Sequence, residues 1–99
     1  MHNLLVDVEA VLQYKENKMK KVLRFTASWC GPCKSLAKIL DNIETNIPFE
    51  VVDIDVHPEI ATDYGIRSVP TLVMLEDNIE VKRMTGVRAE NLMSEWLNG

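Results

Sequence analysis

Apolar and polar residues follow two different patterns along this chain, one typical of strands and one typical of helices. Short runs rich in β-branched and aromatic side chains predict four strands, at residues 21–26, 49–56, 69–75 and 79–84. Apolar residues spaced three and four apart predict helices between and around these strands. The helical positions are Val8, Val11, Leu12 and Tyr14 after a cap at Asp7; Leu36, Ala37, Ile39, Leu40 and Ile43; and Leu92, Met93, Trp96 and Leu97.

Turn-forming residues separate these elements. Pro58 begins a short helix that Gly65 ends, and residues 76–78 (Glu-Asp-Asn) predict a hairpin turn between the last two strands. The order strand, helix, strand, then helix, strand, strand, helix implies a parallel pair followed by an antiparallel hairpin. We therefore expect one α/β domain over residues 1–99. Its central mixed sheet of four or five strands is flanked by about four helices, with helices on both faces.

Composition limits the classes of partner and compartment. With 99 residues and 46% hydrophobic content, one domain buries a core without needing crosslinks. A net charge of −4 gives no overall attraction to nucleic acid or anionic lipid. Asp7 and Glu9 interrupt the N-terminal apolar run that a signal peptide requires, and no later run is long enough to cross a membrane. The expected compartment is the reducing cytoplasm.

The two cysteines, Cys30 and Cys33, carry the candidate chemistry of the chain. Zinc usually takes four protein ligands, and only His2 and His57 remain as further nitrogen donors, so no metal site is expected. A crosslink between residues three apart closes too small a loop to stabilise the fold much. A pair with this spacing in a reducing compartment favours redox catalysis.

The residues around the cysteines suit that chemistry. The strand at 21–26 delivers Cys30 to a helix start, where unpaired N–H groups and the helix dipole favour the thiolate. Gly31 allows a partner to approach, and Pro32 lacks an N–H that the first helical turn leaves unpaired. Cys33 lies one turn later on the same helix face, within reach of a disulfide.

These residues resemble the thioredoxin family. The sequence WCGPCK at 29–34 looks like the family's active-site motif, the segment 53–72 resembles its short helix and proline loop, and Gly86 matches the glycine after its last strand. The likeness covers residues 21–97. It implies the thioredoxin fold and a monomeric dithiol reductase of protein disulfides without bound cofactor. Such a protein is recharged by thioredoxin reductase with NADPH, and one of its substrates is ribonucleotide reductase.

The resemblance also implies roles for individual residues. Cys30 matches the attacking cysteine and Cys33 the resolving cysteine. Pro70 matches the family's cis-proline, and Val69 the residue whose backbone pairs with an extended substrate. The apolar rim on which partners dock comprises Trp29, Gly31, Pro32, Ile66, Gly86 and Val87.

Arg24 departs from the family pattern. Six residues before the first cysteine, where this chain has Arg24, the family usually has a buried aspartate that helps the resolving thiol lose its proton. A lysine commonly accompanies that aspartate, and Val51 stands in its place here. Strand alternation directs Arg24 toward the layer beneath the active-site helix, and Asp53 is its candidate partner, with escape of the side chain to solvent as the alternative. Lys34, one turn after Cys30, is a further candidate for tuning the thiol.

Two other functions fit the sequence less well. A glutaredoxin-like reductase would use glutathione, but that family more often has Pro-Tyr between its cysteines than Gly-Pro. A non-catalytic subunit of a larger complex would use the same fold with incidental cysteines, and replacing both with serine would leave its role intact.

Overall fold

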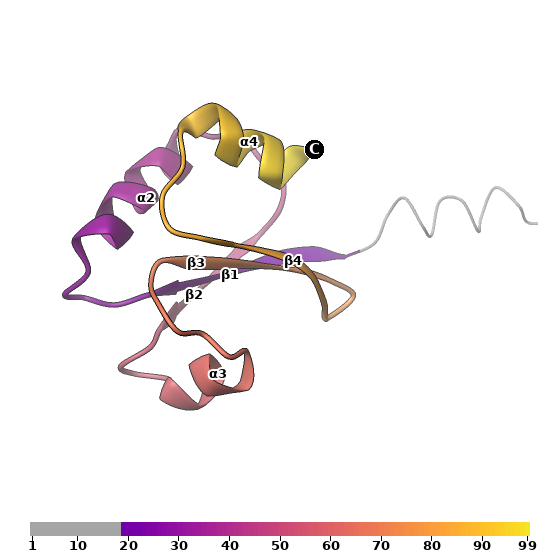
Figure 1. The fold of residues 1–99 in the computed structure, drawn as a ribbon. Helices are drawn as coiled ribbons and strands as arrows, with labels where there is room; N and C mark the ends of the chain where they lie inside the picture. Colours follow the sequence, from indigo (N-terminus) through magenta and orange to yellow (C-terminus); the bar gives the residue numbers. More distant parts are fainter. Residues whose placement is uncertain (1–18) are drawn as a thin grey trace, which may run out of the picture.

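The computed structural model describes residues 19–99 (Figure 1). The elements, in chain order, are β1 (Lys20–Thr26), α2 (Gly31–Asp41), β2 (Phe49–Asp53), α3 (Pro58–Asp63), β3 (Thr71–Glu76), β4 (Ile79–Thr85) and α4 (Glu90–Asn98). The helix expected after Asp7 lies outside the described residues. No helix of residues 19–99 has the length and apolar character needed to cross a bilayer.

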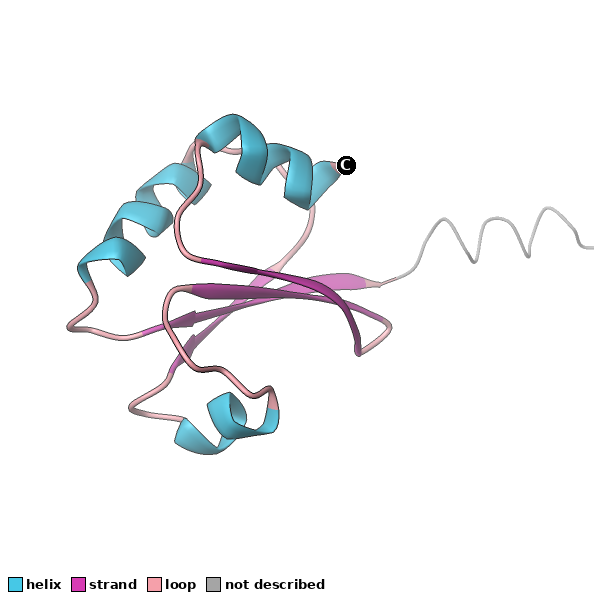
Figure 2. Ribbon diagram, viewed as in Figure 1, coloured by secondary structure: helices cyan, strands magenta, loops and turns pink. Residues whose placement is uncertain are grey.

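A four-stranded mixed sheet in the order β2-β1-β3-β4 forms the middle layer. β1 runs parallel to β2 and antiparallel to β3, and β3 runs antiparallel to β4. Helices α2 and α4 cover one face, whereas α3 covers the other (Figure 2). This arrangement confirms the expected α/β class, the parallel pair, the antiparallel hairpin and the placement of helices on both faces.

Strand alternation divides the core in two. Val22, Leu72 and Met74 point toward α2 and α4, where Leu36 and Met93 complete a buried cluster. Their strand neighbours point to the opposite face under α3 and form a second cluster, made of Leu23, Phe25, Val52, Val73 and Leu75. Because β3 is an inner strand of the sheet, both of its faces are buried, which explains its nearly continuous apolar sequence.

The hairpin between β3 and β4 turns at Asp77 and Asn78, as the sequence predicts. Both residues have positive φ, 52° and 69°, the backbone that a two-residue hairpin turn requires. Asp and Asn tolerate this left-handed conformation better than most residues, which explains why they stand here.

Two predicted strand boundaries are wrong. β2 ends at Asp53 rather than at 56, because the Asp53 carbonyl accepts hydrogen bonds from the backbone N–H groups of Val56 and His57 and turns the chain. β3 begins at Thr71 rather than at 69, so Val69 and Pro70 belong to the preceding loop. Both of these strand boundaries lie near the cysteines, at the end of the sheet that carries the site.

Candidate active site

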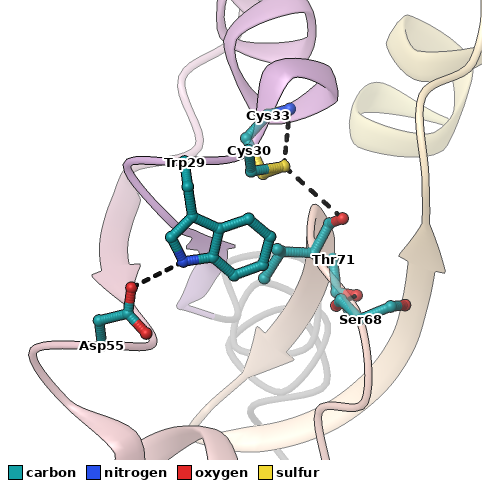
Figure 3. Close-up of a disulfide and its surroundings, with 7 residues drawn as sticks. Trp29, Cys30, Cys33, Asp55, Ser68 and Thr71 are labelled. Atoms are coloured by element: carbon teal, nitrogen blue, oxygen red, sulfur yellow. Dashed lines mark hydrogen bonds between the residues drawn. A yellow bond between two sulfur atoms is a disulfide. The ribbon is translucent and has the colours of Figure 1, made fainter.

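The two cysteines form a disulfide at the start of α2 (Figure 3). Their Cα atoms lie 5.3 Å apart, which confirms that one helical turn brings them within bonding reach. β1 ends four residues before Cys30, and the Cys30 N–H donates to the carbonyl of Ala27 at 3.1 Å, which closes a tight turn between strand and helix. The end of β1 thus places both sulfurs just beyond the C-terminal end of an inner strand of the sheet.

Cys30 is the N-cap residue of α2. Its Sγ accepts a hydrogen bond from the backbone N–H of Cys33 at 3.1 Å, one of the N–H groups that the first helical turn leaves without a partner. A sulfur in this position gains most from such a donor when it carries negative charge. Cys30 and Cys33 are both buried, at 4% and 2% exposed. The geometry therefore favours Cys30 as the thiolate that meets a substrate.

The loop before β3 lies directly against the disulfide. The Val69 carbonyl oxygen is 3.7 Å from the Cys30 Sγ, and the Val69–Pro70 peptide bond is cis, as the resemblance implied. The Thr71 hydroxyl donates to the carbonyl of Ser68 at 2.8 Å, and the Gly86 N–H donates to the carbonyl of Pro70 at 2.9 Å. These two bonds hold the loop at its β3 end.

Gly86 sits where a side chain is unfavourable. Its φ is +85°, a conformation that L side chains rarely adopt, and a Cβ added there would lie 3.1 Å from the Nη1 of Arg88. The glycine lets the chain leave β4 and keep its N–H on the Pro70 carbonyl. The positive φ gives a physical reason for glycine at this position, since the Arg88 side chain could move away from an added Cβ.

Trp29 presents its indole to solvent beside the disulfide, with 67% of the residue exposed. Its Nε1 donates to the Oδ2 of Asp55 at 2.8 Å, which fixes the ring over the start of the loop after β2 (Figure 3). Asp55 was not among the predicted site residues, because no local pattern in the sequence pairs two residues 26 positions apart.

The other predicted rim residues show graded exposure. Gly31 and Pro32 are exposed, Ile66, Val69, Gly86 and Val87 are partly buried, and Pro70 is buried. Val69 packs with the cysteines and Ala27 in a small cluster of its own. Lys34 is exposed on α2.

Arg24 points to the α2 side of the sheet, as strand alternation predicted. It lines a recess of about 300 Å³ together with Ala37, Leu40 and Asp41 of α2, and with Val51 of β2. The side chain is partly exposed. Within the described residues the guanidinium makes no ion pair.

The expected pairing of Arg24 with Asp53 is wrong. In the β1–β2 register Arg24 lies opposite Val51, and Asp53 lies opposite Thr26, one pleat further along. The Asp53 Oδ1 instead accepts the backbone N–H of Asp55 at 2.8 Å, so this carboxylate stabilises the turn that ends β2. Within residues 19–99, no three His, Cys, Asp or Glu side chains gather in a group that would hold a metal ion.

Comparison with known proteins identifies relatives of this chain. A family model described as Thioredoxin matches residues 7–99. A thioredoxin from Rickettsia felis is 31% identical over 102 aligned residues, covering 99% of this chain and 97% of that protein. Thioredoxin H-type 1 from Nicotiana tabacum is 39% identical over 80 residues, covering 78% of this chain and 64% of that protein.

Solved structures give the same answer for the fold. A thioredoxin from Fasciola hepatica aligns with a TM-score of 0.72 and 31% identity, covering 90% of this chain and 88% of that one. A mutant thioredoxin from Halobacterium salinarum aligns with a TM-score of 0.75 and 28% identity, covering 86% and 77%. Sequence, fold and the Cys30–Cys33 disulfide agree: the chain belongs to the thioredoxin family and is a thiol–disulfide oxidoreductase.

Proposed function

We propose that Cys30 is the attacking thiol and Cys33 the resolving thiol in the reduction of protein disulfides. The Cys30 thiolate attacks one sulfur of the substrate disulfide, forms a mixed disulfide and releases the other sulfur as a thiolate that takes up a proton. The Cys33 thiolate then attacks the Cys30 Sγ, forms the Cys30–Cys33 disulfide and releases the second substrate thiol. The substrate gains two electrons and the protein loses two.

One observation about Val69 carries the proposal for substrate docking. Among the described residues, neither the N–H nor the C=O of Val69 has a backbone hydrogen-bond partner, and its carbonyl lies 3.7 Å from the Cys30 Sγ. Backbone groups left free beside a reactive atom are suited to pair with an extended peptide, as a strand adds to a sheet edge. We place the substrate backbone against Val69, above the buried Pro70. The surface around it is formed by Trp29, Gly31, Pro32, Ile66, Gly86 and Val87.

The assignment of the nucleophile predicts unequal thiol reactivity. In the reduced protein, Cys30 should titrate below the free-thiol value of about 8.5 and alkylate much faster than Cys33, because its sulfur caps α2 and accepts the backbone N–H of Cys33. Timed iodoacetamide labelling followed by peptide mass mapping measures both rates across pH. Equal labelling of the two thiols near neutral pH would contradict the assignment.

The docking proposal predicts a defect when Pro70 is replaced. Pro70 is buried, and its carbonyl is bonded to Gly86, so Pro70→Ala removes packing beneath the loop that carries Val69. We expect kcat/KM for insulin to fall about tenfold, since misplacing a reacting group by about 1 Å costs up to 10²-fold.

The matched control for this test is Pro48→Ala, an exposed proline outside the site, which should keep the parent rate. Circular dichroism and thermal unfolding establish that each variant is folded. A folded Pro70→Ala variant that reduces insulin as fast as the parent would remove the loop from the docking surface.

We also propose that the oxidised protein is recharged by a thioredoxin reductase that draws electrons from NADPH. Protein disulfides such as that of ribonucleotide reductase are the proposed substrates, and the protein acts as a monomer in the cytoplasm. Support comes from the family membership and from a redox pair that needs a reducing compartment to turn over. NADPH oxidation coupled to insulin reduction, with purified reductase present and then omitted, tests the electron donor.

A further inference from the structure

The C-terminal end of α3 leads directly into the loop that contains Val69. The N–H of Gly65 donates to the carbonyl of Thr62 at 3.0 Å, and the N–H of Ile66 donates to the carbonyl of Ala61 at 2.9 Å. Gly65 has a φ of +63°. This is a Schellman ending, which satisfies the carbonyls of Ala61 and Thr62 but not that of the cap residue, Tyr64.

Arg83 supplies the missing donor. Its Nη2 donates to the Tyr64 carbonyl at 2.8 Å, across 19 positions of sequence. Arg83 belongs to β4 and lies opposite Val73, whose side chain is buried under α3, so the strand register brings the guanidinium to this face. A cation at a helix C-terminus also complements the negative end of the helix dipole.

Glu80 fixes the position of that guanidinium. Its Oε2 accepts from the Arg83 Nε at 2.6 Å and its Oε1 accepts from the Nη2 at 2.8 Å, a two-point contact with defined geometry. The hydrogen bonds from Arg83 hold the pKa of Glu80 below its usual value, and the same bonds raise the pKa of Arg83. Both side chains therefore stay charged at working pH.

α3 has few other means of holding its position. It is six residues long and contains no buried residue. Ile60, Ala61 and Tyr64 pack only partly against the core beneath, with the Tyr64 ring tilted against Phe25 at a centroid distance of 5.9 Å. The bond from Arg83 therefore adds a directional polar attachment from the sheet to this apolar packing.

The loop from Gly65 to Pro70 is anchored at its two ends. At the β3 end the anchors are the Thr71 and Gly86 hydrogen bonds described above. At the α3 end the anchor is the Arg83 bond to Tyr64, which lies five residues before Val69. A shift of the α3 end moves the loop, and with it the Val69 backbone that lies against Cys30.

We propose that Arg83, held by Glu80, is a positioning residue for substrate binding: it fixes the Tyr64 carbonyl and thereby the place of Ile66 and Val69 relative to Cys30. This inference rests on the docking role proposed for the loop. Arg83 makes no contact with the sulfurs and acts only through the loop. A substrate that uses the Val69 backbone depends on it, whereas a small disulfide that needs only the Cys30 sulfur does not.

The test compares two oxidants with the full chain. Insulin is reduced at steady state with dithiothreitol as reductant, whereas 5,5′-dithiobis(2-nitrobenzoate) is reduced by protein that was reduced beforehand and freed of dithiothreitol, because dithiothreitol attacks this small disulfide directly. For Arg83→Ala we expect the KM for insulin to rise about fivefold with kcat within about twofold of the parent, as loss of one hydrogen bond to the loop anchor implies. The rate with 5,5′-dithiobis(2-nitrobenzoate) should change by less than about twofold. Arg83→Lys keeps a charged donor and should recover much of the insulin KM.

Two further variants separate positioning from a general loss of stability. Lys21→Ala breaks the Lys21–Glu50 ion pair, an exposed contact of 3.5 Å outside the loop, and should leave the insulin KM unchanged. Glu80→Ala leaves Arg83 able to reach Tyr64 but no longer fixed, and should raise the insulin KM about twofold. Because both Arg83 and Glu80 are surface residues, these variants should fold.

Three results would overturn the proposal. If Pro70→Ala impairs insulin reduction but Arg83→Ala does not, the loop docks substrate without help from Arg83. If neither does, the docking role of the loop is itself wrong, and the positioning role falls with it. If Arg83→Ala slows insulin and the small disulfide equally, Arg83 supports the fold or the sulfurs in general rather than the docking loop.

Discussion

A Cys33→Ser variant is expected to attack protein disulfides once and then stop. Its Cys30 keeps the N-cap position at α2 and the nearby Val69 carbonyl, so formation of the mixed disulfide should proceed. Serine at 33 has no sulfur to displace the substrate, and steady-state turnover should fall below about 1% of the parent rate. Non-reducing gels and intact mass should show one equivalent of substrate bound to Cys30 and released by dithiothreitol.

The matched control is Cys30→Ser, which removes the attacking sulfur and should capture nothing. If Cys33→Ser turned over insulin at a rate near that of the parent, a mechanism with two cysteines would be wrong for this protein. If Cys30→Ser captured substrate as well as Cys33→Ser does, the roles of the two sulfurs would be exchanged. The same trapped complex would identify physiological substrates in a cell extract.

Much of the fold was predictable because its signals are local. Alternation in residues 21–26 predicted that Arg24 and Thr26 share a face, and the structure places Arg24 on the α2 side. The hairpin turn at Asp77 and Asn78 follows from the backbone that those two residues tolerate. The spacing of Cys30 and Cys33 on one helical turn fixed their separation.

The wrong partner for Arg24 and the missed acceptor of Trp29 concern relationships that depend on distant parts of the chain. Alternation in a strand shows which face of the sheet a side chain takes, but not how far that strand is shifted along its neighbour. In the observed β1–β2 register Asp53 lies opposite Thr26, two residues away from the position opposite Arg24. The Trp29–Asp55 and Arg83–Tyr64 hydrogen bonds join segments 26 and 19 positions apart. No periodicity in the sequence marks them, because each depends on how separate elements pack.

Arg24 leaves this site without the internal base that the family usually has at the same position. An arginine side chain has only donors and keeps its proton at working pH, so it cannot accept the proton of Cys33. The recess that it lines reaches Ala37, one helical turn after Cys33 on the same face of α2. We propose that its positive charge there favours the Cys33 thiolate electrostatically, since an arginine offers the resolving step no proton acceptor.

This reasoning predicts opposite effects for two substitutions. Arg24→Ala removes the charge, which should raise the pKa of Cys33 and slow resolution of the mixed disulfide by about threefold near neutral pH. Arg24→Asp puts a carboxylate in the recess that is able to accept the proton. Because general-base catalysis contributes about 10²- to 10⁴-fold where geometry is favourable, we expect resolution at least about tenfold faster than in Arg24→Ala.

Arg24→Asn is the matched control, since it has the shape of the aspartate without its basicity and should behave like Arg24→Ala. Resolution is measured by stopped flow as release of the second thiol from a preformed Cys30 mixed disulfide, and the Cys33 titration is followed in the same variants. Because Arg24 is partly exposed, substitution should leave the protein folded, which thermal unfolding checks. Equal resolution rates for Arg24→Asp and Arg24→Asn would show that position 24 passes no proton to or from Cys33. If Arg24→Ala left both the resolution rate and the Cys33 titration unchanged, the guanidinium would be too well solvated to act on the thiol. In that case water reaching the recess, or another carboxylate, takes the proton.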